Sequence, residues 1–406
     1  MFVIFVAPMF SPAATQMIEA GLNIPHVGLA VISQQSLDHL PAALAHRLVA
    51  HWRVDDVTDA AQLEHAVRQL GARHGAIARC FGAYEQAQLP LAIVRERLGI
   101  GGLSSHAAHQ FRDKARMKDV LRAAGVPVAR HRLITSPADA RHFVAEVGFP
   151  IVIKPPAGAG ARATERIRDA AQLDAALARH APSGTDPMLA EEFLQGTEHS
   201  LETVSVGGQP VWHSLTRYGP PPLEVIENPW IQWTVLLPRE VDDAQYDDIR
   251  AVGDKALVAL GMTTGVSHCE WFRRTDGSVA ISEIAARPPG ANMTTMMSRA
   301  NDMDFVQAWM RLMIHGAFAL PERKYAVGTA YLRGQGRGRV THIEGLDTVQ
   351  RELGALVCDA RLPYHGQTPT GSYEGEGFLI VRHPETAVVQ HALTRIVSTV
   401  RVHLGA

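Results

Sequence analysis

The amino-acid sequence predicts an α/β protein that begins with a parallel sheet. Through the first hundred residues, short runs rich in β-branched residues alternate with helical stretches. This alternation is typical of a parallel sheet with helices on both faces. The predicted buried strands are residues 2–6, 27–32, 48–53 and 76–80, and the predicted helices lie near 60–70 and 86–98. No GxGxxG follows the first strand, so the usual dinucleotide-binding fingerprint is absent.

The remaining elements follow in the order of the chain. A helix with a charged start is predicted near 111–124, because its apolar residues recur at a helical period before Gly125 and Pro127. Residues 131–206 predict strand, helix, strand, loop, strand, helix and two strands. The proline-rich stretch 219–230 is predicted to be a loop that faces a substrate. A helix near 241–260, two strands and two helices precede a β-rich tail that closes with a helix near 384–401.

Composition excludes several classes of protein. The 406 residues are 46% hydrophobic and 20% charged, which is ordinary for a globular chain and excludes extended disorder. The net charge of −2 gives no electrostatic basis for binding nucleic acid or an anionic membrane. Cys80, Cys269 and Cys358 lie far apart, so neither a disulfide framework nor a cysteine-ligated metal is expected.

The location predicted for the chain is the cytoplasm. The apolar N-terminus lacks the basic segment of a signal peptide and is interrupted by Pro8, so it reads as a first strand. No apolar run approaches the roughly 20 residues that span a bilayer. The 20 histidines are scattered and show no HExxH spacing, so most are expected to be structural.

Two glutamates in a predicted hairpin are the strongest candidate site. Residues two apart in a strand share a face, so Glu270 lies with His268, and Glu283 lies with Ile281 and Ala285. The Asp-Gly turn between the strands predicts a hairpin that sets the two carboxylates side by side. Their repulsion and desolvation would be relieved by Mg²⁺, bound through one or two carboxylates and substrate phosphates. From the hairpin alone, glutamates that face water or pair with arginines remain an equal alternative.

Two further segments are compatible with phosphate and nucleotide binding. In IVIKPPAGAGARAT, Lys154 ends a strand before a loop containing Gly158 and Gly160, whose backbone N–H groups could hold phosphate oxygens. In LAEEFLQGTEHS, an apolar strand leads into Glu191, with Glu198 seven residues on. Taken singly, an ordinary turn and a solvent-exposed acidic strand end are the simpler readings of these segments.

The order of these segments resembles the ATP-grasp superfamily. Lys114 in the RDKxxMK helix start, Lys154 before the glycine-rich loop, EEFLxGxE and then Glu270 and Glu283 follow that superfamily's sequence over about residues 100–320. The resemblance implies an ATP-grasp fold in three parts. These are an N-terminal α/β domain (1–105), an ATP-grasp domain (106–320) with a lid at about 128–195, and a small β-rich C-terminal domain (321–406).

The resemblance also implies a role for each matching residue. Lys114 and Lys154 would contact the ATP phosphates, and Arg287, with Lys154, would act in catalysis by neutralising charge on the transferred γ-phosphoryl group. Glu270 and Glu283 would hold one or two Mg²⁺ ions, with Mn²⁺ as the alternative. The nucleotide would be bound by Glu191, Phe193, Leu194 and Ile281 at adenine and by Glu198 at the ribose. Such a division of labour suits phosphoryl transfer, which depends on positioning and electrostatic stabilisation.

One position departs from the superfamily pattern. Many members have an asparagine two residues after the second metal glutamate, whereas this chain has Ala285 in EIAARPPG. Water or bidentate Glu283 would then replace a ligand. The same AxR-type segment resembles the L-amino acid ligase (dipeptide synthetase) branch, as does the β-rich C-terminal region.

The expected reaction joins a carboxylate, expected to be an amino acid, to an amine through an acyl phosphate, releasing ADP and phosphate. Substrate contacts are expected from His268, Asn292, Glu227 and Trp230, each with an ordinary structural role as the alternative. Two alternatives stay open. The first is a carboxylase- or purine-pathway-type ligase, which the basic cluster of Arg333, Arg337 and Arg339 would suit. The second is a nucleotide-binding scaffold without catalysis. The expected partners are small molecules, with neither nucleic acid nor membrane, and a homodimer is compatible with the sequence.

Overall fold

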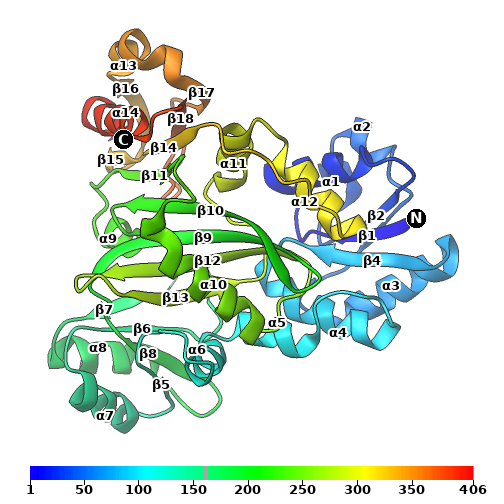
Figure 1. Ribbon diagram of the computed structural model, residues 1–406, viewed down its shortest axis with the longest axis horizontal. Helices are drawn as coiled ribbons and strands as arrows, with labels where there is room; N and C mark the ends of the chain where they lie inside the picture. Colours follow the sequence, from blue (N-terminus) through cyan, green and yellow to red (C-terminus); the bar gives the residue numbers. More distant parts are fainter. Residues whose placement is uncertain (159–162, 406) are drawn as a thin grey trace.

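The computed structural model describes residues 1–158 and 163–405, and within them the strands form four sheets (Figure 1). The N-terminal sheet is parallel, in the order β3-β2-β1-β4. Its strands are β1 (Phe2–Val6), β2 (Gly28–Ser33), β3 (Ala50–Arg53) and β4 (Ile77–Gly82). Its helices are α1 (Pro12–Leu22), α2 (Ala42–Ala45), α3 (Ala60–His74) and α4 (Gln88–Leu98). The predicted parallel α/β layer is therefore confirmed.

Both faces of this parallel sheet are covered because its strands are apolar on both sides. Val3 and Phe5 of β1 belong to a core cluster with α1 and with α12 (Phe305–His315), where Trp309 lies against Phe5. Ile4 and Val6 face the opposite way, into a cluster with α3 and α4. Helix α12 follows the N-terminal layer by more than 200 residues in the sequence, so its packing joins that layer to the central body of the protein.

An antiparallel sheet of order β5-β8-β6-β7 forms the lobe at the lower left of Figure 1. It contains β5 (His131–Ile134), β6 (Ile151–Lys154), β7 (Glu165–Ile167) and β8 (Met188–Glu192). Helices α7 (Pro137–Val147) and α8 (Ala170–His180) bury Phe143, Leu173 and Leu177 against it. The predicted order of strands and helices over 131–206 is confirmed. Gly160 of the predicted glycine-rich loop lies outside the described residues.

The central sheet has eight strands in the order β13-β12-β9-β10-β11-β14-β18-β17, paired antiparallel throughout. Its first five in chain order are β9 (Gly196–Val206), β10 (Gln209–Gly219), β11 (Trp233–Leu237), β12 (Gly265–Arg274) and β13 (Val279–Ala285). The C-terminal region continues the same sheet with β14 (Ala326–Leu332), β17 (Val357–Arg361) and β18 (Gly377–His383). The C-terminal region is thus built onto the central sheet by main-chain hydrogen bonds.

The helices of the central body are α5 (Ser105–Arg112), α6 (Lys114–Ala123), α9 (Pro222–Glu227), α10 (Asp247–Ala259) and α11 (Met293–Asn301), besides α12. A smaller sheet of order β15-β19-β16 lies beside the central one and contains β15 (Gly334–Gly336), β16 (Arg339–Glu344) and β19 (Arg401–Gly405). Helix α14 (Thr386–Thr399) packs against β14 and β18 of the central sheet, and α13 (Leu346–Leu353) packs against α14.

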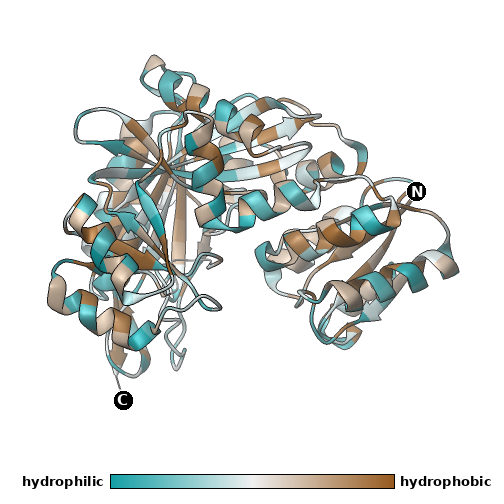
Figure 2. Ribbon diagram, turned by 90° about the horizontal axis from the view of Figure 1, so that it is seen from below, coloured by the Kyte–Doolittle hydropathy of each residue, from teal (hydrophilic) through white to brown (hydrophobic). Residues whose placement is uncertain are grey.

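One prediction about local structure is wrong. The stretch 219–230 is not loop throughout, because α9 begins at Pro222. Proline at the first helical position loses no hydrogen bond and has the right φ, so it starts a helix here. Figure 2 shows hydrophobic residues gathered on the strands and on one side of many helices. No described helix is long and apolar enough to cross a bilayer.

Candidate active site

The predicted hairpin brings Glu270 and Glu283 opposite each other as paired residues of β12 and β13. Its turn is closed by Asp276, whose carboxylate accepts from the Ser278 N–H at 2.9 Å, and by Gly277 with a φ of 85°. On its other side, β12 places Glu270 opposite Ser200 of β9. Glu270 and Glu283 both line a cavity between the central sheet and the β5–β8 lobe.

The two carboxylates are surrounded by most of the residues that the sequence identified. The predicted residues that line this cavity are Lys114, Lys154, Glu191, Phe193, Leu194, Glu198, His268, Glu270, Glu283 and Arg287. They come from α6, β6, β8, β9, β12 and β13 and from the segments that follow β8 and β13. The fold therefore gathers into one site residues that lie up to about 170 positions apart in the sequence.

Ile281 does not line the cavity, and the expectation that it shares a face with Glu283 is wrong. The register of β12 and β13 shifts between Glu270 and Trp271, so that Trp271 lies opposite Ile281 and Ser282 is an extra residue on β13. Such a bulge reverses the alternation of faces. Ile281 packs with Trp271 in a core cluster, while Ser282 and Phe272 line the cavity.

The other three predicted substrate contacts also lie outside the cavity lining. Glu227 forms ion pairs with Arg166 and with Arg168, the latter at 3.0 Å. Trp230 is 65% exposed. Asn292 precedes α11 in a left-handed conformation, and only its neighbours Ala291 and Met293 line the cavity.

Three lysines neutralise the carboxylates of the site. Lys114 Nζ lies 2.8 Å from Glu283 Oε1, and the Asp113 cap of α6 fixes the start of its helix. Lys154 Nζ lies 2.9 Å from Glu191 Oε2, and Lys118 Nζ lies 3.3 Å from Glu191 Oε1. Burial lowers the pKa of Lys118; for Lys154 the carboxylates of Glu191 and Glu283 outweigh burial and raise its pKa.

Lys118 was missed by the sequence analysis, although it lies four residues after Lys114 on the same helix face. It is fully buried, and its ammonium also donates to the backbone oxygen of Ser282. The Glu191 carboxylate is thus held between two ammonium groups. The contact of its Oε2 with Lys154 indicates that Glu191 orients this lysine. Its Oε1 has no hydrogen-bond partner among the described residues, and the contact of Glu191 with adenine stays a prediction.

Replacing Lys118 with methionine tests this buried ion pair. We expect the free energy of unfolding to fall by roughly 2 kcal/mol, because Glu191 keeps Lys154 but loses one of two buried partners. Denaturant unfolding of the variant measures the change. Arg68→Met is the control, since Arg68 pairs with Glu64 at the exposed surface, and it should change stability by less than about 0.5 kcal/mol. Equal losses in the two variants would contradict the role given to Lys118.

The pKa values of two carboxyl groups of the site, Glu283 and Glu198, are shifted in opposite directions. Burial alone would raise the pKa of Glu283, but Lys114 and Lys154 outweigh burial and lower that pKa to about 2. Burial and the neighbouring Glu270 raise the pKa of Glu198 well above its ordinary value. An added hard cation would relieve this repulsion, so the donor set of Glu270 and Glu283 fits Mg²⁺.

His268 links the site to a buried carboxylate that the sequence analysis missed. Its Nδ1 lies 2.8 Å from Glu202 Oε1, and its Nε2 lies 3.6 Å from Glu270 Oε1. Burial disfavours the imidazolium, but Glu202 and Glu270 outweigh burial and raise the pKa of His268 to about 9. Glu202 also accepts from Ser200 Oγ at 2.6 Å. Alternation along β9 puts Glu198, Ser200 and Glu202 on one face, a signal that could have identified Glu202.

Arg287 is held by Glu85 of the N-terminal layer, with Nη2 2.7 Å from Glu85 Oε2. Glu85 lies in a single turn of 3₁₀ helix (Glu85–Ala87) and also pairs with Arg112 at 3.1 Å. Some 200 residues separate Glu85 from Arg287, and no local pattern in the sequence marks Glu85 as part of the site. The N-terminal layer therefore orients a residue of the cavity.

One part of the cavity lining is apolar and aromatic; Leu223 comes from the stretch 219–230 that was predicted to face a substrate, and the sequence analysis missed the other residues. Tyr218, Trp233, Tyr373, Leu223 and Met293 contribute to it. The ring centroid of Trp233 lies 5.8 Å from that of Tyr218 and 4.7 Å from that of Tyr373. The indole N–H of Trp233 donates to the Pro220 oxygen at 3.0 Å, which fixes the ring. The lining thus combines a charged region of carboxylates and lysines with a rigid aromatic surface.

Comparisons with known proteins show which sequences and folds this chain is similar to. Residues 119–302 match the ATP-grasp domain family, so the chain contains an ATP-grasp domain. An uncharacterised protein of Sinorhizobium fredii is 28% identical over 334 residues, which are 80% of this chain and 68% of that protein. An L-arginine-specific L-amino acid ligase of Bacillus subtilis is 25% identical over 281 residues, which are 66% of each chain.

The fold matches a solved structure over its whole length. The crystal structure of an L-amino acid ligase from Bacillus licheniformis superimposes with a TM-score of 0.78 and 17% identity, covering 100% of this chain and 99% of that one. The mixed α/β fold of this protein is therefore the ATP-grasp fold, as the sequence predicted.

Proposed function

We propose that this protein is an ATP-dependent ligase that joins the carboxylate of an amino acid to an amine through an acyl phosphate. The observation that supports this most is the single cavity in which Lys114, Lys154, Glu270, Glu283 and Arg287 converge. Three cationic side chains and a carboxylate pair in one partly buried site suit the transfer of a phosphoryl group between bound reactants. The sequence similarity to an L-amino acid ligase supports the class of substrate.

The nucleotide would bind with its adenine near Phe193 and Leu194. The Phe193 N–H already donates to the Pro150 oxygen at 3.3 Å, so the backbone of Leu194 is the better candidate for the adenine edge. This part of the proposed site is lined by Phe272 and Ser282, and not by Ile281 as the sequence predicted. Glu198 would hold the ribose hydroxyls.

The phosphates would lie between Lys114 and Lys154. Glu270 and Glu283 would hold Mg²⁺, which would neutralise charge on the phosphate oxygens. Lys114 and Lys154 would orient the γ-phosphoryl group, and Arg287 would hold the attacking carboxylate beside it. The resulting acyl phosphate reacts with the amine, and phosphate leaves while an amide bond forms.

None of Arg333, Arg337 and Arg339, the basic cluster that supported a purine-type substrate, lines the cavity that holds Glu270 and Glu283. Arg333 is buried and donates to the backbone oxygens of Val225 at 3.0 Å and Asn228 at 3.3 Å. It holds α9 and the following turn in place. Arg339 donates to the Gly366 oxygen at 2.8 Å. The cluster therefore gives no support for a phosphorylated substrate bound in this cavity.

Substrate-dependent release of phosphate tests the proposed function. The chain is incubated with Mg²⁺-ATP and the twenty amino acids, singly and in pairs, and phosphate is measured together with mass spectrometry of the products. We expect at least one pair to stimulate phosphate release by roughly tenfold or more over ATP alone and to yield a dipeptide. Tight ATP binding without stimulation by any pair would support the scaffold alternative and contradict the proposal.

A further inference from the structure

A second cluster of possible metal ligands lies away from the cavity, in the small sheet of β15, β16 and β19. His342 and Glu344 are two residues apart on β16, and His403 lies on β19 opposite His342. None of the three lines the cavity that holds Glu270 and Glu283. The sequence analysis set the histidines aside for lack of ligand spacing, but strand pairing brings together two histidines 61 positions apart.

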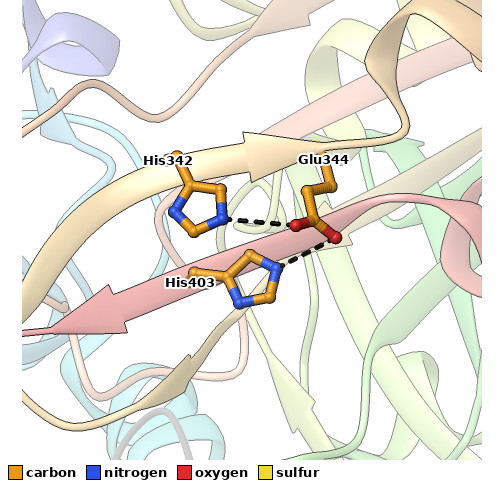
Figure 3. A group of neighbouring side chains, drawn as sticks. All are labelled: His342, Glu344 and His403. Atoms are coloured by element: carbon orange, nitrogen blue, oxygen red, sulfur yellow. Dashed lines mark hydrogen bonds and ion pairs between the residues drawn. The ribbon is translucent and has the colours of Figure 1, made fainter.

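The rings of His342 and His403 both face the carboxylate of Glu344, as Figure 3 shows. The imidazole rings of His342 and His403 are stacked, with centroids 4.3 Å apart and planes inclined by 3°. His342 Nε2 lies 3.3 Å from Glu344 Oε1, and His403 Nε2 lies 3.3 Å from Glu344 Oε2. One ligand atom from each residue lies within 4.8 Å of the others.

These separations match a shared metal ion. Ligand atoms about 2.0–2.2 Å from one tetrahedral ion lie roughly 3.4 Å from each other. The two nitrogen–oxygen separations are both 3.3 Å, although each nitrogen faces a different oxygen of Glu344. Rotation of the stacked rings about their side-chain bonds is required for both Nε2 lone pairs to point at one ion. A neutral imidazole nitrogen and a carboxylate oxygen each offer a lone pair, so a cation between them satisfies both groups.

Two details of the surroundings strengthen this interpretation. His403 Nε2 is buried and has no hydrogen-bond partner, although a carboxylate oxygen lies 3.3 Å away, because the geometry is not that of a hydrogen bond. His342 Nδ1 lies 3.1 Å from Thr341 Oγ1, so its outward nitrogen is oriented by a neighbour while Nε2 faces the cluster. Metal-bound histidines are commonly oriented in this way through their other ring nitrogen.

We propose that His342, Glu344 and His403 bind a divalent transition-metal ion of the Zn²⁺ and Ni²⁺ class. Two imidazole nitrogens and one carboxylate oxygen suit such ions better than Mg²⁺ or Ca²⁺, which prefer oxygen ligands alone. The side chains of His342 and Glu344 are 57% and 61% exposed, so water can complete the coordination. The bound ion joins β19, the last strand described, to β16 and stabilises that end of the fold.

Calorimetric titration of the untagged chain with Zn²⁺, and separately with Ni²⁺, tests the site. The titration is made in millimolar Mg²⁺ and in the Glu283→Gln background, so that binding to the cavity carboxylates is suppressed. We expect one equivalent to bind and His403→Gln to weaken the affinity by roughly tenfold or more. His142→Gln is the control. His142 also lies beside a carboxylate, that of Glu146 at 3.0 Å on an exposed helix, but this pair contains no second histidine that could complete a metal site.

Stability gives a second readout that is independent of ligase activity. Zn²⁺ should raise the midpoint of thermal unfolding of the parent chain and of His142→Gln, and should have little effect on His403→Gln and His342→Gln. A shift of equal size in all four proteins would place the ion elsewhere and overturn the proposal. Failure of the chain to bind either ion in the titration would overturn it as well.

Discussion

Replacing Glu283 with glutamine should reduce ligase turnover by about 10³-fold, because the change removes one of two carboxylates proposed to hold Mg²⁺ at the phosphates. Glutamine keeps the shape of the side chain but not its charge. Glu283 is also the partner of Lys114, at 2.8 Å, so the variant frees an ammonium group at the same place. Initial rates of phosphate release across a Mg²⁺ series measure the effect.

The dependence on Mg²⁺ separates a metal ligand from a residue that only supports the fold. If Glu283 is a metal ligand, the Mg²⁺ concentration that gives the half-maximal rate should be higher in Glu283→Gln than in the parent chain. EDTA should also abolish the activity of the parent chain. Glu352→Gln, at an exposed pair with Arg395, should retain parental turnover and parental Mg²⁺ dependence. If Glu283→Gln kept a turnover within twofold of that of the parent, Glu283 would not be a ligand of the catalytic Mg²⁺.

Replacing Arg287 with methionine should lower kcat by roughly 10³-fold while leaving the affinity for ATP within a few-fold of the parent. The physical reason is that Arg287 is proposed to act on the attacking carboxylate and on charge that develops during transfer. Interactions that strengthen only in the transition state lower kcat when they are lost, and they leave ground-state binding nearly unchanged.

The matched control for Arg287 is Arg299→Met, which removes an arginine of a carboxylate pair with Asp359 outside the cavity. It should leave kcat unchanged. Glu85→Gln is expected to have an intermediate effect, because Glu85 orients Arg287 at 2.7 Å without lining the cavity. A loss of ATP affinity as large as the loss of kcat in Arg287→Met would instead place this arginine at the phosphates of the ground state.

Local patterns predicted the fold well where a strand or a helix depends on its own residues. The alternation of apolar strands and amphipathic helices before residue 100 predicted the parallel sheet, since both depend on short-range periodicity. Glu270 and Glu283 were predicted as neighbours because an Asp-Gly turn fixes a hairpin. The helix that starts at Pro222 was missed because proline was read only as an interruption.

The residues missed at the site depend on effects that a single strand pattern does not contain. A bulge at Ser282 moved Ile281 into the core, and nothing in the β13 sequence marks that extra residue. Glu85 reaches Arg287 because the N-terminal layer packs against the central body, through α12 and through the contact of α4 with α5. The pairing of His342 with His403 likewise comes from contact between strands distant in the sequence.

The transfer of oxygen from substrate to phosphate tests the proposed reaction most directly. An amino acid whose carboxylate carries ¹⁸O is incubated with the chain, Mg²⁺-ATP and the amine, and the released phosphate is analysed by mass spectrometry. An acyl phosphate places a carboxylate oxygen on phosphorus, so each phosphate formed should contain one ¹⁸O atom. Phosphate without ¹⁸O would show that water attacks ATP directly, and it would contradict the account.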